Sequence, residues 1–328
     1  MESNKPQMAF TVAHMAAGLP FYRSRRWLNF DAILIGTMLP DLPYFLDLVF
    51  LQSLLIGSTN TAIYLSHYWS GLFIYCLPWG LLVLGIWTWV LKPAAIALAQ
   101  PWLCGLLSAR PLLENMPNFH IYDKSYFLKD RLQFTLKRGI IFWSKVVVGL
   151  LLGSATHLLW DGTTHPDGFI AEQVSLLQKI VTVYGLGEMP VARLLQYLSS
   201  LLGLLMLGRF AYLLYWLPSS SYSPENSVYS NMTSKDYSSS YTMLQPLTLQ
   251  KSHSLVIISL ILSSAVIFSL QAVTKWHTLL ESDNYLFLAK VTVGFMQGTG
   301  ILFIAYALFF QLYLQVRKAL LLPNTYRK

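Results

Sequence analysis

Long apolar stretches separated by short polar segments run through most of the chain. A helix that crosses a bilayer needs about 20 largely apolar residues. The stretches that meet this length are 71–91, 139–160, 191–217, 254–274 and 285–314. A further stretch, 31–55, has the length but is interrupted by two prolines. The pattern predicts an all-α, polytopic membrane helix bundle with about six transmembrane helices.

Two other apolar stretches are too short to cross a membrane. They cover residues 8–19 and 94–107, and the second contains Pro101. We expect both to be interfacial or half-inserted helices that lie against the bundle. Composition supports the membrane class, because 55% of the 328 residues are hydrophobic and only 12% are charged, against roughly 25% in soluble domains. A soluble α/β enzyme, a disordered chain and a disulfide scaffold are therefore excluded.

The distribution of Lys and Arg predicts the orientation. If the N-terminus and the 92–138 loop are cytoplasmic, seventeen basic residues lie in inside segments and two in outside loops. Cytoplasmic loops of membrane proteins carry such an excess, so both termini are predicted to be cytoplasmic. The net charge of +8 then reflects topology, and we expect the lipid bilayer as a partner and no nucleic acid.

A polar segment divides the chain. Residues 218–253 are rich in Ser, Tyr and Asn, a composition that cannot bury enough apolar surface to offset chain entropy. We therefore expect a membrane bundle over 1–217, a flexible linker over 218–253, a two-helix membrane hairpin over 254–316 and a basic tail over 317–328.

Ionisable residues inside the apolar stretches are the candidates for chemistry, because an unpaired charge in hydrocarbon costs several kcal/mol. The N-terminal part contains a series of them: His14, Asp41, His67, His157, Asp161 and His165. In the predicted topology His67, His157, Asp161 and His165 fall near the extracytoplasmic face, with Asp41 somewhat deeper. The depth of His14 stays open.

The spacing of two of these residues suits a metal ion. His157 and Asp161 stand at i and i+4 and share one helix face, so they offer one imidazole nitrogen and one carboxylate oxygen. Asp41 lies between Pro40 and Pro43, which restrict the backbone and let it project from a break in the helix. The mixed nitrogen and oxygen set suits Zn²⁺, with Mn²⁺ or Fe²⁺ as alternatives.

Several motifs carry a resemblance. They are Ala9–His14, Ile35–Phe45, His67 at the start of an apolar helix, Thr156–Gly168 and Leu194–Ser199. They resemble an uncharacterised bacterial membrane-protein family, the domain of unknown function 4184, over about residues 8–217. More distantly, that family is similar to predicted membrane-bound metal-dependent hydrolases and to zinc-dependent phospholipase C. The resemblance implies a place in the bacterial cytoplasmic (inner) membrane.

The same resemblance implies ligand roles for His14, Asp41, His67, His157 and Asp161, with His165 as a further ligand. Phospholipases of this type end their ligand set with a His-x3-Glu pair, which only His277 and Glu281 offer in this chain.

Three functional hypotheses follow from these residues. The first is a metal-dependent hydrolase acting on a lipid-like ester or phosphoester, in which Asp161 is a ligand or the general base. The second is a non-enzymatic protein, such as a transporter component, in which the His and Asp residues form a cation or proton path. The third is a structural protein in which polar side chains only hold helices together.

Overall fold

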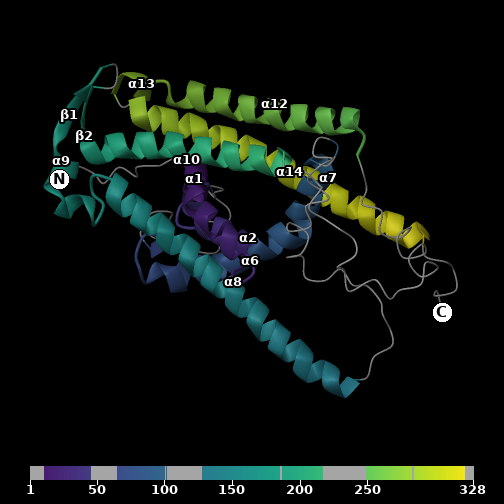
Figure 1. The fold of residues 1–328 in the computed structure, drawn as a ribbon. Helices are drawn as coiled ribbons and strands as arrows, with labels where there is room; N and C mark the ends of the chain where they lie inside the picture. The colour runs from purple at the N-terminus through teal and green to yellow at the C-terminus, as the bar shows by residue number, and fades with distance from the viewer. Residues whose placement is uncertain are drawn as a thin grey trace. The chain divides into compact units, whose positions relative to one another are not determined.

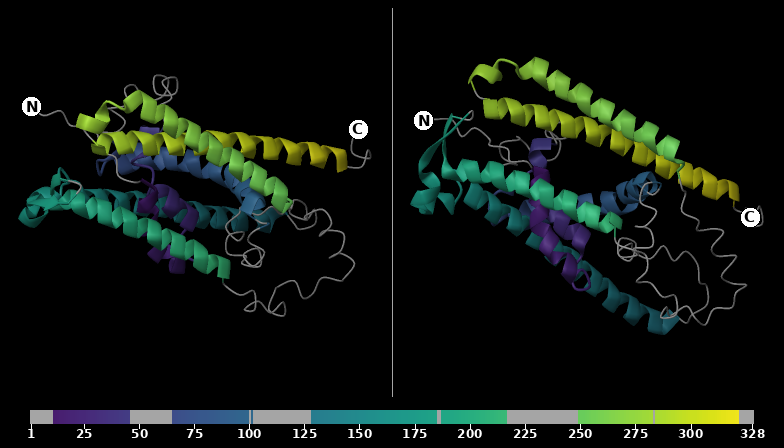
Figure 2. Two further views of the ribbon diagram at one scale, coloured as in Figure 1. Left: turned by 90° about the horizontal axis from the view of Figure 1, so that it is seen from above. Right: turned by 45° about the horizontal axis from the view of Figure 1, so that its top comes forward.

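The structure is a computed structural model that describes residues 11–45, 65–99, 101, 128–184, 187–216, 249–282 and 284–321. In this part of the chain five helices are long and apolar enough to cross a membrane: Leu72–Ala99, Gly139–Thr164, Val191–Leu213, Lys251–Trp276 and Leu286–Arg317. The only strands of the described residues form one small antiparallel pair. The protein is therefore an all-α, multi-pass membrane protein, as the apolar pattern predicted (Figures 1 and 2).

The described helices agree with the five uninterrupted predicted spans, with shifted ends. The longest are α8 (Leu128–Thr164), α10 (Val191–Trp216), α12 (Lys251–Trp276) and α14 (Asn284–Leu321). The fifth is continuous from Leu72 to Ala99 through the π-helix η2 (Leu72–Cys76), α6 (Leu77–Ile86), the π-helix η3 (Trp87–Leu91) and α7 (Lys92–Ala99).

Two predictions need correction. The stretch 94–107 does not begin as a separate half-inserted helix, because residues through Ala99 continue the preceding span; residues 102–107 lie outside the described part. The sixth predicted span, 31–55, is not one helix where it is described. It forms α2 (Phe30–Gly36), a turn at Pro40 and Asp41, and α3 (Leu42–Phe45). Proline lacks a backbone donor, which explains why the helix stops there.

The chain divides into two compact units that are interleaved along the sequence. Unit 1 comprises 1–85, 118–210 and 272–293, and unit 2 comprises 86–117, 211–271 and 294–328. The predicted division into a bundle, a linker, a hairpin and a tail stays a prediction, because residues 217–248 and 322–328 lie outside the described part.

The centre of unit 1 is the contact between α2 and α8. Gly36 and Gly153 let the two backbones approach so closely that a Cβ on Gly36 would stand 2.5 Å from the Leu150 carbonyl oxygen. The hydroxyl of Ser154 donates to the carbonyl of Gly36 at 3.0 Å. Asn29 caps α2 by accepting from the backbone N–H of Ala32 at 3.0 Å, which is a preferred role for Asn. This contact fixes the turn after α2 against α8.

Short elements complete unit 1. The N-terminal stretch forms α1 (Thr11–His14) and the 3₁₀ helix η1 (Met15–Ser24), too short to cross a membrane, as predicted for residues 8–19. After α8 the chain forms η5 (Ala171–Gln173), α9 (Ser175–Gln178) and a hairpin of β1 (Ile180–Val183) and β2 (Gly187–Pro190). The helix α13 (Leu279–Ser282) precedes α14.

Unit 2 is held together by small residues. Ala94 and Ala97 of α7 cluster with Ala307 and Phe310 of α14. The helices α12 and α14 run side by side (Figures 1 and 2), and they come closest where Gly298 faces Ser264. Small residues at such contacts are typical of helix association in membranes.

Candidate metal centre

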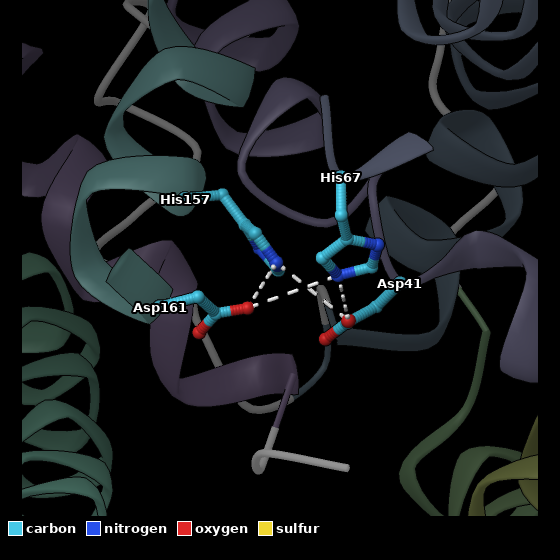
Figure 3. A group of neighbouring side chains, drawn as sticks. All are labelled: Asp41, His67, His157 and Asp161. Carbon is cyan, nitrogen blue, oxygen red and sulfur yellow. Dashed lines mark ion pairs between the residues drawn. The ribbon is translucent and has the colours of Figure 1, made fainter. Parts of the chain in front are cut away.

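Four of the predicted site residues converge at one point of unit 1. His157 and Asp161 come from α8, Asp41 from the turn between α2 and α3, and His67 from the turn that precedes η2. Figure 3 shows the four side chains directed toward one another. One nitrogen or oxygen atom of each lies within 4.8 Å of those of the other three. This group has the composition and the size of a site for one metal ion.

The individual distances suit ligands of one ion. The Nε2 atom of His157 lies 2.9 Å from Asp161 Oδ2 and 3.6 Å from Asp41 Oδ1. The Nε2 atom of His67 lies 3.5 Å from Asp41 Oδ1 and 3.8 Å from Asp161 Oδ2. A tetrahedral zinc ion with bonds of about 2.0–2.2 Å holds its ligand atoms about 3.3–3.6 Å apart. Most of the separations are therefore longer than hydrogen bonds and close to the edges of a coordination polyhedron.

A backbone carbonyl fixes the protonation of His157. Its Nδ1 atom lies 2.7 Å from the carbonyl oxygen of Thr37. Because a carbonyl only accepts, Nδ1 carries the proton, and a neutral imidazole then has a free electron pair at Nε2. That atom faces the two carboxylates. Histidine ligands of metals are usually oriented by such a bond from their other nitrogen.

His67 is oriented in the same sense by Ser66. The Ser66 hydroxyl donates to the Pro40 carbonyl at 2.7 Å, and its oxygen lies 2.9 Å from His67 Nδ1. Since the single hydroxyl proton is used, the oxygen accepts the Nδ1 proton of His67. The Nε2 atom of His67 therefore also presents an electron pair to Asp41 and Asp161.

Of the two carboxylate oxygens of Asp41, one is hydrogen-bonded and the other is available to an ion. The Thr11 hydroxyl donates to Asp41 Oδ2 at 2.6 Å, which leaves Oδ1 as the oxygen that faces both imidazoles. The backbone N–H of Tyr44 bonds to the Asp41 carbonyl at 3.0 Å and holds the turn. Asp41 thus projects from a break in the helix, as the flanking prolines suggested.

The centre is buried and contains a polar atom that lacks a hydrogen bond. The side chain of His157 is fully buried, that of Asp41 is 3% exposed and that of His67 is 27% exposed. Among the described residues, the buried Asp161 Oδ1 accepts no hydrogen bond, and the buried His157 Nε2 faces only the carboxylate oxygens of Asp161 and Asp41. A buried polar atom without a partner costs about 1–3 kcal/mol. A cation would remove this cost, so the residues fit a metal ion.

His14 lies beside the four-residue group but outside it. Its Nε2 atom is 3.4 Å from Asp161 Oδ1, and its ring contacts the rings of His157 and Trp160 at centroid distances of 4.2 and 5.5 Å. Burial, aided by the nearby His157 imidazole, lowers the pKa of His14 to about 4. His14 is therefore neutral at physiological pH, with one nitrogen free of a proton.

His165 approaches the same carboxylate from the loop after α8. Its Nδ1 atom lies 3.4 Å from Asp161 Oδ1 and 3.3 Å from the Asp161 carbonyl oxygen. Its Nε2 atom lies 3.0 Å from the side-chain amide of Gln196 on α10. His277 is exposed at the end of α12, with Nδ1 2.9 Å from the Thr274 carbonyl, and the side chain of Glu281 lies outside the described part.

The residues that orient the histidines and Asp41 were not anticipated from the sequence. Thr11, Ser66 and Gln196 are uncharged, and the carbonyl of Thr37 belongs to the backbone, so composition and spacing give no signal for them. One sign was present for Ser66, because it directly precedes His67 in an otherwise apolar context. Ser and Gln in such segments usually find hydrogen-bond partners.

The comparisons with known proteins give one family. The model of that family matches residues 8–310, well beyond the 8–217 range over which the motifs resembled it. No curated protein and no solved structure matches the chain. The match ascribes no activity, and the distant similarity to hydrolases finds no support in these comparisons. By the extent of the match, the chain belongs to the family described as a domain of unknown function (DUF4184).

Proposed function

We propose that the protein is an integral-membrane, metal-dependent hydrolase whose ion is held by Asp41, His67, His157 and Asp161. One observation carries the proposal. In His67 and His157 an acceptor holds the ring proton on Nδ1, and the Nε2 atoms of both rings face two carboxylates in a buried place. The Nε2 electron pairs and the negatively charged carboxylates repel each other unless a cation lies between them. Zn²⁺ suits the set best, and Mn²⁺ and Fe²⁺ also accept it.

Each of the four side chains has its own role in this proposal. His67 and His157 bind through Nε2, Asp41 binds through Oδ1, and Asp161 binds or acts as the general base. A divalent ion in such a site supplies a nucleophile at neutral pH by lowering the pKa of a coordinated water toward about 7. His67 is the most exposed of the four side chains, so water and substrate enter beside it. Thr11 and Ser66 keep the ligands in place.

The location of the site suggests the substrate class. Asp161 stands three residues before Thr164, the end of the apolar span of α8, which is about 4.5 Å along a helix. His67 comes five residues before the span that begins at Leu72. The ligands thus lie near the ends of two spans, where a lipid headgroup meets the apolar region. A lipid-like ester or phosphoester is the substrate that this position favours.

Metal analysis of the purified full chain in detergent tests the proposal. We expect stoichiometric metal in the wild type, an affinity for the ion of this four-residue group that is at least 10-fold lower in His157→Ala, and no change in His277→Ala, which removes an exposed histidine outside the site. Hydrolysis of lipid esters and phosphoesters should stop with a chelator and return with Zn²⁺ or Mn²⁺. A wild type that binds no metal after incubation with these ions contradicts the proposal.

One observation favours a rival function. The 2.9 Å contact between His157 and Asp161 also suits a protonated imidazole paired with a carboxylate, as in proton or cation paths. The rival predicts ion flux in proteoliposomes that Asp41→Asn abolishes, together with no bound metal and no hydrolysis. The two functions therefore differ in every one of these measurements.

A further inference from the structure

The two oxygens of Asp161 face two different sets of histidines. Oδ2 faces His157 and His67, the set described above. Oδ1 faces His14 Nε2 and His165 Nδ1, each at 3.4 Å. A carboxylate with histidine nitrogens on both sides has the geometry of a bridge between two positions.

The Oδ1 side has the signature of a second ion position. Oδ1 is buried and accepts no hydrogen bond from any described residue, although two imidazoles lie beside it. A separation of 3.4 Å matches the spacing of two ligand atoms on one ion, about 3.3–3.6 Å for tetrahedral zinc. An ion bound by Oδ1, His14 Nε2 and His165 Nδ1 would give the buried Oδ1 a partner.

His14 is held in place by ring contacts. Its ring lies against His157 and Trp160, and its side chain is 1% exposed. The Nδ1 atom is buried and has no hydrogen-bond partner in the described part of the chain. A buried imidazole kept without a hydrogen bond is costly, and its orientation makes sense when Nε2 binds a ligand.

His165 can present its Nδ1 electron pair through Gln196. The Gln196 amide nitrogen lies 3.0 Å from His165 Nε2 and, as placed, donates to it. Turning the amide by 180° brings the Gln196 carbonyl oxygen to that position instead. With the oxygen turned toward Nε2, His165 carries its proton there, and Nδ1, which otherwise donates to the Asp161 carbonyl oxygen at 3.3 Å, presents its electron pair to an ion. Gln196 is then a positioning residue, in the role that Thr37 and Ser66 have for His157 and His67.

We propose that the site holds two divalent ions bridged by Asp161, the second bound by Asp161 Oδ1, His14 Nε2 and His165 Nδ1. The inference rests on the proposed function, because the first ion shares Asp161. Ions in two-metal sites stand about 3.5–4 Å apart and typically serve displacement at phosphorus. The second ion therefore narrows the substrate class to a lipid-like phosphoester.

The number of ions per chain tests the second site. The full chain in detergent is stripped with a chelator, loaded with Zn²⁺, desalted and analysed for metal and protein. We expect two ions in the wild type and in His277→Ala, and one in His165→Ala and in His14→Ala. One ion in the wild type and in both variants overturns the second site and leaves the first intact. No ion in the wild type overturns both, and two ions in both variants overturn the assignment of the ligands.

Electron paramagnetic resonance with Mn²⁺ gives a readout that misfolding does not imitate. A pair of bridged Mn²⁺ ions is magnetically coupled, whereas a single bound ion gives the six-line signal. We expect coupling in the wild type and the single-ion signal in His165→Ala. Gln196→Leu, which removes no ligand, should weaken the second ion by about 10–100-fold and leave the first unchanged. An uncoupled wild type, or full affinity in Gln196→Leu, contradicts the arrangement.

Discussion

The helix α8 of unit 1 and the helix α12, which lies mostly in unit 2, are both long and apolar enough to cross a membrane, yet they use their polar residues differently. In α12, Ser254, Ser263 and Ser264 donate to backbone carbonyls, at 2.6, 2.8 and 3.0 Å. In α8, Ser154 also bonds to a carbonyl, but Asp161 keeps a buried oxygen without a hydrogen bond within the described residues, and His157 Nε2 faces two carboxylates.

The difference separates polar residues that stabilise the fold from polar residues that are placed to bind a ligand. Hydroxyls that bond to nearby carbonyls stabilise a membrane helix and are satisfied without a ligand. Buried imidazole and carboxylate atoms that lack partners cost free energy, and a ligand is the usual reason to keep them. Substitutions in unit 1 should therefore change ion binding, whereas matched substitutions in unit 2 should change stability alone.

The largest effect is expected from Gly153→Ala. The added Cβ would meet the Ile33 carbonyl oxygen and force α2 away from α8. Overpacking of this kind costs about 1–3 kcal/mol, and it moves Asp41 and Thr37 out of the centre, so both thermal stability in detergent and metal content should fall. Gly139→Ala is the control, because no atom lies within 4 Å of its Cβ position. Equal metal content in both variants would contradict the α2–α8 contact as the support of the site.

A smaller effect is expected from Ser66→Ala. The substitution removes the acceptor that places the His67 proton on Nδ1, and loss of such an orienting partner lowers metal affinity by about 10–100-fold. Competition with a metal-binding dye measures the change. Ser263→Ala in α12 should bind the ion like the wild type, and an unchanged affinity in Ser66→Ala would refute the role of Ser66.

The smallest effect is expected from Ser264→Ala. It removes the bond to the Gly298 carbonyl, and such bonds between membrane helices contribute about 0.6 kcal/mol on average. Thermal unfolding in detergent should shift by a degree or two, with metal content unchanged. A loss of metal in this variant would abolish the contrast between the two units.

Much of the fold followed from the length of the apolar stretches. Five spans were predictable because a hydrocarbon core of fixed thickness demands helices of about 20 residues. The ends of the spans were less predictable, since the Lys92-Pro93 step does not end the helix that runs to Ala99. The hairpin β1–β2 was not expected, because two strands of four residues carry too little pattern to be recognised.

The residues of the centre could be named from the sequence, but their division into a four-residue group and two further histidines could not. His157 and Asp161 were paired by helix periodicity alone. The separation into a four-residue group and a second pair of histidines depends on which oxygen of Asp161 each imidazole faces, and that is a property of packing. The orienting bonds from Thr37, Ser66 and Thr11 depend on packing too.

The bond between His157 and the Thr37 carbonyl joins residues 120 positions apart. During synthesis, Asp41 and His67 are made long before the end of α8, so the centre cannot assemble until more than 160 residues have been made. A chain truncated before α8 would carry a lone carboxylate at a break in an apolar stretch. Assembly of the centre is therefore a late event in the synthesis of the N-terminal half.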